Sequence, residues 1–407
     1  MLQRAIIVGG GIGGLTAARA LLRHGIQVTL LEKAAAFLPT TGAAFGFSSN
    51  GQICLESLGL GDALEPILHP FRRYKVTTRH ETLYDDNHFE RFYDQTGFSI
   101  SGVLRADLVS VLADSLGDNV IQYNSKVVSI HQTPSQVQVT LENGATMYAD
   151  FVVGADGINS TVARAIVENP PDAPVYCGDN VFYGVLDHIP GYAEPGTLLQ
   201  HYDMGEYIQY PAGPSHFIWA QCYKADAPPT KDEWTGGADN TSVARAFAST
   251  LPVGHPLHAS LAATAPHRLL HFGLHYRKPM AKWHLGRVVL LGDACHATLP
   301  YAGQGANLAI EDGVVLGQLI AQHRSDPAVA FEAFHEARFN RTKRVVDMAW
   351  YMGKLTHVDG VVTGPLRNAV LKALFASGLL MKAAMAEIVD HCPVPIPAKE
   401  AKPSDSK

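Results

Sequence analysis

A glycine-rich turn between a predicted strand and a predicted helix restricts the fold of this chain more than any other feature. An apolar run leads into Gly9, Gly11 and Gly14, which have the G-x-G-x-x-G spacing of a dinucleotide fingerprint, with Ile12 and Gly13 between them. The first glycine permits a sharp turn. The second lets backbone N–H groups approach a pyrophosphate, and the third lets helix and strand pack closely. The helix N-terminus then favours the bound anion.

The segment that follows supports this interpretation. Residues 27–31 have the pattern of a second strand, and this strand ends in Glu32, 23 residues after Gly9. An acidic residue at about this offset binds a ribose hydroxyl in dinucleotide-binding folds. Lys33, the next residue, is a further candidate for contact with the cofactor. An ordinary glycine turn followed by a surface glutamate is the simpler alternative.

Two later strands end in similar turns. Phe151–Val153 runs into Gly154–Gly157, which contains Asp156, and Val288–Leu291 runs into Gly292 and Asp293. Ligands of open parallel sheets bind at the carboxyl ends of the strands, so three such ends would converge on one cofactor if the strands are neighbours. The alternative for the second turn is a purely structural one that Asp156 caps.

The third turn continues into a pattern suited to a flat, electron-accepting ring. Gly303 and Gly305 leave backbone N–H groups uncovered at the start of a long predicted helix, and Ala306 and Asn307 follow. A helix N-terminus favours negative charge. A reduced flavin carries negative charge near its N1 and C2 carbonyl, and protein charge there tunes the cofactor.

Together these motifs closely resemble one enzyme family. The four-part set is the first glycine turn with Glu32, Leu104-Arg105 opening a helix, Gly154–Gly157, and the run from Gly292 to Asn307. It resembles the single-component, group A FAD-dependent flavoprotein monooxygenases of the para-hydroxybenzoate hydroxylase fold, in the salicylate-hydroxylase-like branch. The resemblance covers residues 4 to about 345. Small departures are Ala297 after His296 and Ala163 before Arg164.

The resemblance implies both the reaction and the roles of the matched residues. NADH or NADPH would reduce FAD, O2 would form a flavin C4a-hydroperoxide, and an aromatic small molecule, phenolic or heteroaromatic, would be hydroxylated. By this resemblance, the FAD pyrophosphate would be bound by Gly9, Gly11 and Gly14 with Ile12 and Gly13, and the adenosine ribose by Glu32 with Lys33. Arg105 would contact the phosphate or ribityl chain, Asp293 the ribityl or pyrophosphate part, and Asp156 FAD and transiently NAD(P)H. The isoalloxazine ring would be surrounded by Pro300, Gly303, Gly305, Ala306 and Asn307.

The same patterns predict a mixed α/β fold with interleaved domains. A Rossmann-like FAD-binding domain with a parallel sheet is expected from residues 1–70, 101–175 and 277–350. A second, substrate-side β-sheet domain is expected from residues 71–100 and 176–276, with helices at 231–251 and 256–263. Residues 351–392 are expected to be C-terminal helices and 393–407 a disordered tail. Residues 37–51 have the composition of an irregular loop.

Residues on the substrate side are weaker predictions. Tyr210 and Pro300 are candidate catalytic residues, because the resemblance places both near the flavin, and His201 is a third. A tyrosine base would need its pKa moved toward the working pH. Tyr223 is a lesser candidate, and Phe45, Phe47 and Phe182 are possible apolar walls. For each of these residues plain core packing is the alternative.

The bulk composition excludes several other classes of protein. The chain has 407 residues with 47% hydrophobic and 17% charged, which fits a globular protein. A net charge of -6 gives no indication of a nucleic-acid partner, and five scattered cysteines without a C-x-x-C motif fit free thiols in a reducing compartment. No apolar run reaches the length of a membrane span. We therefore expect a cytoplasmic monomer or homodimer without stable membrane insertion.

The sequence contains one histidine pair that could suggest a metal site, and its flavin motifs are compatible with more than one reaction. His267 and His271 lack a third ligand at a known spacing, so no metal site is predicted. Two other flavin functions stay open at this point. One is epoxidation or oxidation of a non-phenolic conjugated molecule such as an isoprenoid or polyketide. The other is a non-oxygenating FAD-binding reductase.

Overall fold

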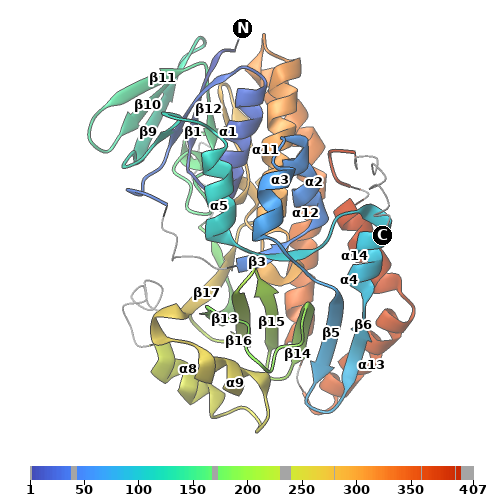
Figure 1. The fold of residues 1–407 in the computed structure, drawn as a ribbon. Helices are drawn as coiled ribbons and strands as arrows, with labels where there is room; N and C mark the ends of the chain where they lie inside the picture. The colour runs from blue at the N-terminus through green and yellow to red at the C-terminus, as the bar shows by residue number, and fades with distance from the viewer. Residues whose placement is uncertain are drawn as a thin grey trace.

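The computed structural model describes residues 2–37, 44–166, 173–229, 240–278, 280–358, 360–389 and 391–395. Two large β-sheets dominate it, one in the upper and one in the lower half of Figure 1, and helices from the last third of the chain run along both. The mixed α/β class with a parallel sheet is confirmed. The proposed domain boundaries stay a prediction.

The sheet predicted around the glycine-rich turn has six strands, and it is parallel except for the pair at one edge. Residues Ala5 to Val8 of its central strand are buried, which is why the strand is uniformly apolar. In spatial order the strands are β18 (His284–Leu285), β19 (Val288–Leu290), β12 (Phe151–Gly154), β1 (Arg4–Val8), β2 (Gln27–Leu31) and β8 (Ile121–Gln122).

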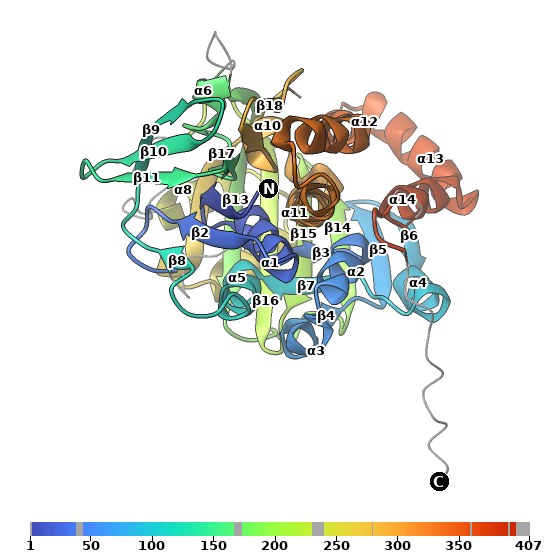
Figure 2. The same ribbon diagram turned by 90° about the horizontal axis from the view of Figure 1, so that it is seen from above.

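Two helices that begin at the edge of this sheet pack closely along their lengths. They are α1 (Ile12–Arg23) and α11 (Gly305–Gln322), which lie next to each other in Figure 2. Glycines permit the close approach, because a Cβ added at Gly317 would lie 2.6 Å from the Cβ of Ala20, and one at Gly313 would lie 2.8 Å from the Ala17 nitrogen. The long helix α12 (Pro327–Thr356) packs against α11.

The second large sheet has seven strands and two covered faces. Its inner face, which includes Tyr210 and Ile218, packs against Leu299 and the helix α12. Its outer face, which includes Tyr207 and Trp219, packs against α8 (Asn240–Ala248) and α9 (Pro256–Ala263). In spatial order the strands are β17 (Leu269–Tyr276), β13 (Val175–Leu186), β16 (His216–Lys224), β15 (Glu206–Ala212), β14 (Thr197–Tyr202), β5 (Arg73–Thr78) and β6 (Thr82–Asp86).

Smaller elements complete the fold. Two three-stranded sheets consist of β11 (Thr146–Ala149), β10 (Val137–Leu141) and β9 (Val127–Gln132), and of β3 (Ala44–Phe47), β7 (Ser101–Leu104) and β4 (His69–Pro70). The remaining helices are α2 (Ser49–Ser57), α3 (Gly61–Leu64), η1 (Glu65–Ile67), α4 (His88–Thr96), α5 (Arg105–Asp114), α6 (Ala163–Ile166), η2 (Pro266–Arg268), α10 (Asp293–His296), η3 (Pro300–Ala302), α13 (Thr363–Ala376) and α14 (Leu379–Val389).

Three local predictions need correction or fall outside the described residues. The expected loop at 37–51 contains β3, which pairs with β7, and the first residues of α2. The expected strands at 71–100 include the helix α4. Residues 231–239 of the helix expected at 231–251, and residues 396–407 of the expected tail, lie outside the described residues.

The C-terminal helices expose several apolar side chains, including Leu366, Val370 and Leu379. No single helix among the described residues is long and apolar enough to cross a bilayer. Among the residues that the structure describes, one pair of helices, α13 with Leu379–Ile388, reaches the required length and composition together, and the two are bent by 71° at the break between them.

Candidate functional site

Three strand ends meet at one edge of the six-stranded sheet, as predicted. Val8 lies opposite Gly154, and Gly154 lies opposite Leu290, so the three strands β1, β12 and β19 end level with one another. The turns that follow them therefore begin side by side. This arrangement confirms that the first glycine turn, the Asp156 turn and the Asp293 turn are neighbours, while their convergence on one cofactor stays a prediction.

The first turn needs two of its glycines for the fold and leaves the third open. Gly9 has a φ of +106°, and a Cβ at this position would lie 2.4 Å from the Ala155 carbonyl oxygen. A Cβ at Gly14 would lie 2.0 Å from the Gly9 carbonyl oxygen. Both distances are too short for any side chain. A Cβ at Gly11 would meet only Arg105 Nη2, at 3.8 Å. Helix α1 begins without a side-chain cap, so its first N–H groups can bind an anion in front of Gly11.

Glu32 lies beside this turn, as the spacing predicts. Its carboxylate accepts hydrogen bonds from the backbone nitrogens of Gly10 and Ala34, both at 2.8 Å, which fix it at the end of β2. Lys33 is exposed next to it. The position suits a ribose contact, and that contact itself stays a prediction for both residues.

Arg105 and Asp293 lie on the same side of the turn. Both side chains are exposed, and the positive charge of Arg105 is close enough to act on the Asp293 carboxylate. Crowding by the surrounding protein raises the pKa of Asp293, while His296 and Arg105 act in the opposite direction. An arginine and a carboxylate around an open helix N-terminus can together hold a phosphate and a sugar hydroxyl.

Asp156 has a structural role in the described residues. Its carboxylate accepts hydrogen bonds from the Ser160 hydroxyl and from the backbone nitrogens of Thr161 (2.6 Å) and Val162 (3.2 Å). The carboxylate therefore orders the turn after β12, as the alternative interpretation has it. A direct contact with a cofactor stays a prediction.

The start of α11 provides a second open helix N-terminus at this site. The first hydrogen bond of the helix runs from the Leu308 nitrogen to the Gln304 carbonyl, at 2.8 Å, and no side chain caps the end. The N–H groups of Gly305, Ala306 and Asn307 are thus available to a ligand. Before the helix, Pro300 is exposed at the start of η3, and Gly303 is exposed with a φ of +61°.

The Asn307 side chain does not face this opening. Its Oδ1 accepts from the Ser48 nitrogen at 3.1 Å, and its Nδ2 donates to the carbonyls of Gly46 (3.3 Å) and Gly303 (3.0 Å). The side chain therefore ties β3 to the turn before α11. Only the backbone N–H of Asn307 remains for a cofactor, which corrects the expectation for this side chain.

A buried charge network beneath the site was not predicted. Asp312 accepts from the Gly292 nitrogen (3.0 Å), and its Oδ2 lies 2.6 Å from His296 Nε2, while Arg338 donates to Asp312 Oδ1 (2.7 Å). Burial alone would raise the pKa of Asp312, but the nearby His296 and Arg338 hold it well below its usual range. Glu311 is paired with Arg338 and Arg341 in the same way. The network fixes the Asp293 turn to α11 and α12.

Acidic residues in the middle of an apolar helix were the available sequence signal for this network. Glu311 and Asp312 follow one another inside α11, and both are fully buried. Charged residues are almost never fully buried unless they are paired. Two arginines three positions apart on the next helix are the matching partners.

Tyr210 lies on the inner face, near the site, but its environment opposes a role as a base. Its hydroxyl donates to the Ala44 carbonyl at 3.3 Å, beside Tyr183, whose hydroxyl accepts from the Ala44 nitrogen at 2.6 Å. Burial raises the pKa of Tyr210 well above its usual value, although the hydrogen bond with Tyr183 lowers it slightly. The phenol therefore stays protonated at neutral pH.

We expect Tyr210→Phe to change the turnover rate by less than a few fold, with no shift in its pH profile between pH 6 and 9. The reason is that the protonated hydroxyl donates one long hydrogen bond and accepts no proton. Rates of wild type and variant measured across that range test this. A loss of 10² or more with a moved alkaline limb would instead assign general-base catalysis to Tyr210.

His201 was wrongly predicted to be catalytic. It pairs across the strands with Tyr207 on the outer face, its Nδ1 lies 2.9 Å from the Thr77 hydroxyl, and its ring packs edge-on against His255. Successive residues of a strand point to opposite faces, so His201 faces away from the site while Gln200 faces it.

Three other candidate residues pack in hydrophobic clusters, whereas the role of the half-buried Phe45 as an apolar wall stays a prediction. Tyr223 and Phe182 stack on each other at the outer face, with ring centroids 5.1 Å apart. Phe47 is fully buried in the core of the six-stranded sheet, and Phe45 packs against that core. For Tyr223, Phe182 and Phe47 the plain core-packing alternative holds.

The histidine pair considered for metal binding is divided between two elements. His267 lies on η2 and His271 lies on β17, where its Nε2 is 2.8 Å from the Tyr223 hydroxyl. Within the described residues, no group of three or more His, Cys, Asp or Glu side chains is arranged to hold a metal ion.

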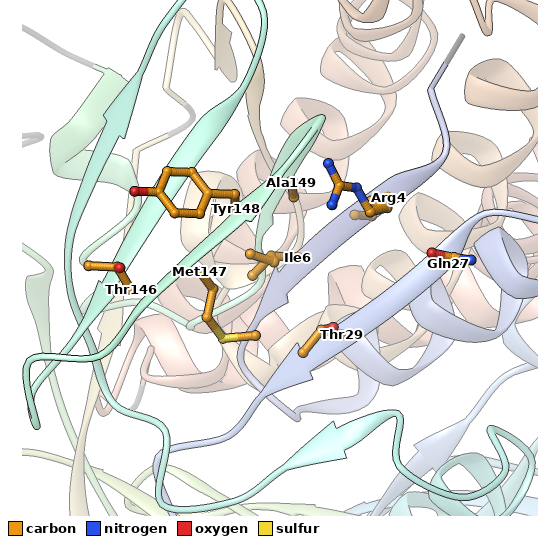
Figure 3. A pocket seen from close by; sticks show the side chains of 9 residues that line it. Arg4, Ile6, Gln27, Thr29, Thr146, Met147, Tyr148 and Ala149 are labelled. Atoms are coloured by element: carbon orange, nitrogen blue, oxygen red, sulfur yellow. The ribbon is translucent and has the colours of Figure 1, made fainter.

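A surface hollow of about 380 Å³ lies away from this site. Figure 3 shows it between the β1–β2 pair and β11, lined by Arg4, Gln27 and Thr29 on one side and by Met147 and Tyr148 on the other. Arg4 and Gln27 are the first residues of their strands, whereas the three turns described above follow the last residues. The hollow is therefore at the wrong end of the strands for the predicted cofactor.

Comparison with known proteins agrees with this geometry. A family model described as an FAD binding domain matches residues 3–175 and 255–349. The chain is 31% identical to 3-hydroxybenzoate 6-hydroxylase of Klebsiella oxytoca over 88% of this chain and 90% of that protein, and 29% identical to salicylate hydroxylase of Pseudomonas putida over 88% and 87%. The crystal structure of Klebsiella pneumoniae HpxO with FAD and uric acid superimposes with a TM-score of 0.87 at 25% identity, covering 97% of this chain and 98% of that one. The chain thus belongs to the FAD-dependent monooxygenases that include salicylate hydroxylase and 3-hydroxybenzoate 6-hydroxylase.

Proposed function

We propose that this monooxygenase uses NADH or NADPH and O2 to hydroxylate a small aromatic molecule. The observation that carries the proposal is the uncapped N-terminus of α11, which follows Pro300 closely in the chain and belongs to a helix that packs against α1, with Ala309 next to Gly13. A nicotinamide-binding module would need only the β1–α1 turn. A second open helix end, about 300 residues later in the chain, suits the flat ring of a flavin.

The residues around the three strand ends fit FAD. The N–H groups before Gly14 and the open space at Gly11 would take the pyrophosphate, and Glu32 would take the adenosine ribose. Arg105 and Asp293 would hold the phosphate and ribityl part. Bound FAD supplies the electron storage and O2 activation that side chains cannot supply.

The protein's own part in the reaction is placement, exclusion of water and stabilisation of charge. The α11 N–H groups would stabilise negative charge on the bound ring. Apolar side chains of the inner face, including Val181, Ile208 and Ile218, pack against Leu299 beside Pro300 and would exclude water from the reacting atoms. The ring of a small aromatic molecule between this face and the Pro300 turn would contact mainly these apolar side chains.

Oxygen-18 labelling of the purified, FAD-loaded protein tests the proposal. We expect a flavin absorbance spectrum, NAD(P)H oxidation stimulated by at least one aromatic compound, and one atom of ¹⁸O from ¹⁸O2 in the product. A panel of phenols, heteroaromatics, polyphenols and carotenoids also separates aromatic hydroxylation from epoxidation. Protein that stays colourless after FAD titration, or that oxidises NAD(P)H without labelling any compound, would contradict the proposal. The second result would indicate a reductase.

A further inference from the structure

One end of the inner face carries polar side chains that the reaction described above does not use. Glu206 of β15 is only 5% exposed, and its carboxylate accepts a 2.7 Å hydrogen bond from Gln200 Nε2. The Gln200 Oε1 accepts in turn from the hydroxyl of Tyr74, and more weakly from that of Tyr202 at 3.4 Å. These four residues are called the Glu206 cluster below.

The carboxylate of Glu206 differs in its ion pairing from the nearby carboxylate of Asp179. Within the described residues no basic side chain forms an ion pair with Glu206. Asp179 on β13, by contrast, accepts from Lys224 Nζ (2.5 Å) and the Tyr301 hydroxyl (2.8 Å), and lies 3.4 Å from His357 Nε2. Burial raises the pKa of Glu206 to about 7, Gln200 lowers it somewhat, and Asp179 adds to the rise.

Glu206 lies on the part of the sheet that meets the Pro300 turn. Cys222 on β16 pairs with Glu206 on one side and with Val181 on the other, so the three residues form a row across the inner face. Tyr301, the residue after Pro300, packs on this face and donates its hydroxyl to Asp179. We take the ring of a substrate held against Pro300 to extend along this row toward Glu206, an inference that rests on the proposed function.

The basic groups nearby are already engaged. Lys224 pairs with Asp179, while Arg367 of α13 lies over the Tyr202 ring at 5.4 Å and donates to the Thr356 carbonyl and to Asn368. A substrate carboxylate next to Glu206 would bring two negative charges together in a desolvated place, which is unfavourable. The relatives named for 3-hydroxybenzoate and salicylate act on molecules that carry such a carboxylate.

We infer that Glu206 selects aromatic substrates carrying a cationic or N–H-donating nitrogen group and disfavours benzoates, with Gln200 holding its carboxylate in position. The substituent would donate to Glu206 while the ring lies against the Pro300 turn. Charge attraction and hydrogen bonding to a buried carboxylate would both act on such a nitrogen. Specificity would thus come as much from rejecting anions as from binding the right group.

Three compounds that differ in one substituent test this inference: 3-hydroxybenzylamine, 3-hydroxybenzamide and 3-hydroxybenzoate. Each is titrated into FAD-loaded protein at pH 8, and binding is read from the change in the flavin absorbance spectrum. We expect the amine to bind at least tenfold more tightly than the benzoate, with the amide between them. Glu206→Gln should weaken amine binding at least tenfold and narrow the difference between the compounds. Glu194→Gln, a matched change of an exposed glutamate, should leave all three affinities unchanged.

The pH dependence of amine binding provides a second measurement. Ionised Glu206 attracts the cation and protonated Glu206 does not, so affinity for 3-hydroxybenzylamine should rise roughly tenfold from pH 6 to pH 8 in wild type and stay flat in Glu206→Gln. An equal slope in Glu206→Gln would overturn the role of Glu206. The groups that act on Glu206 are Tyr74 from β5, Gln200 and Tyr202 from β14, Asp179 from β13, Cys222 from β16 and Tyr301 from η3. Behind them, His357 lies beside Asp179, and Arg367 of α13 lies over the Tyr202 ring.

The outcomes separate this inference from the proposed function. Benzoate binding as tight as amine binding, or a Glu206→Gln variant with wild-type preferences, would overturn the role of Glu206 while leaving an FAD-dependent hydroxylase in place. Failure to bind FAD or to label any compound with ¹⁸O would overturn the proposed function itself. The expected result is a flavin-containing, labelling enzyme whose preference for the amine depends on Glu206.

Discussion

A Gly14→Ala variant is expected to lose most of its FAD and to become less stable by about 1–3 kcal/mol, the usual cost of forcing an extra methyl into a filled space. The new Cβ would overlap the Gly9 carbonyl oxygen, and both atoms belong to the backbone, so no side-chain rotation can relieve the overlap. The glycine turn would have to open. Urea unfolding of the apoprotein and FAD titration measure the two effects separately.

Gly11→Ala should separate binding from folding. Its Cβ would meet only the flexible end of Arg105, and its backbone has ordinary angles (φ −75°, ψ 176°), so apoprotein stability should stay within about 0.5 kcal/mol of wild type. The methyl would nevertheless stand where the pyrophosphate approaches, and FAD affinity should fall at least tenfold. Gly191→Ala, which meets no atom within 4 Å, is the matched control. Wild-type FAD affinity in Gly11→Ala would show that the cofactor does not bind over this turn.

The Arg338→Met variant should show the largest loss of stability, about 3–5 kcal/mol, because it leaves Asp312 and Glu311 as buried charges without their main partner. Arg338 is 1% exposed, and its guanidinium contacts both carboxylates at 2.7 Å. Since Asp312 also holds the Gly292 nitrogen, FAD affinity should fall together with stability. Chemical unfolding followed by circular dichroism and by flavin fluorescence measures both.

Lys343→Met is the control for this change. Lys343 forms an exposed i,i+4 pair with Asp347 on the same helix, and such pairs contribute about 0.3–0.5 kcal/mol. The double variant Arg338→Met with Asp312→Asn should recover part of the loss, because it removes one of the unpaired charges. If Arg338→Met destabilised the protein no more than Lys343→Met does, the network would have no part in holding the Asp293 turn.

The FAD-binding half of the site was predictable because its signals are local. A strand that runs into glycines and an acidic residue specifies a turn, and three such turns on parallel strands meet wherever the strands are neighbours. The exact use of each side chain was less predictable. Asp156 and Asn307 bind their own turns, since short polar side chains there can satisfy nearby backbone groups as readily as a ligand.

The substrate half could not be assigned from sequence because both faces of its sheet are covered. Successive residues of a strand point to opposite faces, so a one-residue shift in the register of the strand moves every side chain to the other face. His201 and Gln200 are such neighbours, and the sequence offers no alternation between apolar and polar positions to tell which one faces the cofactor. The sequence contains no signal for Glu206 for a related reason: an acidic residue after Met204-Gly205 is typical of a hairpin turn.

The order of strands in the six-stranded sheet has a consequence for synthesis on the ribosome. β1 pairs with β12, and β12 pairs on its other side with β19, whose first residue, Val288, is made 134 residues after Gly154, the last residue of β12. At about 5–20 residues per second, that interval is on the order of 7–27 s. During this time the nascent chain holds one edge of β12 without its final neighbour, and an unpaired edge is a template for pairing with other chains. Chaperone dependence should therefore be greatest before residue 290 has left the ribosome.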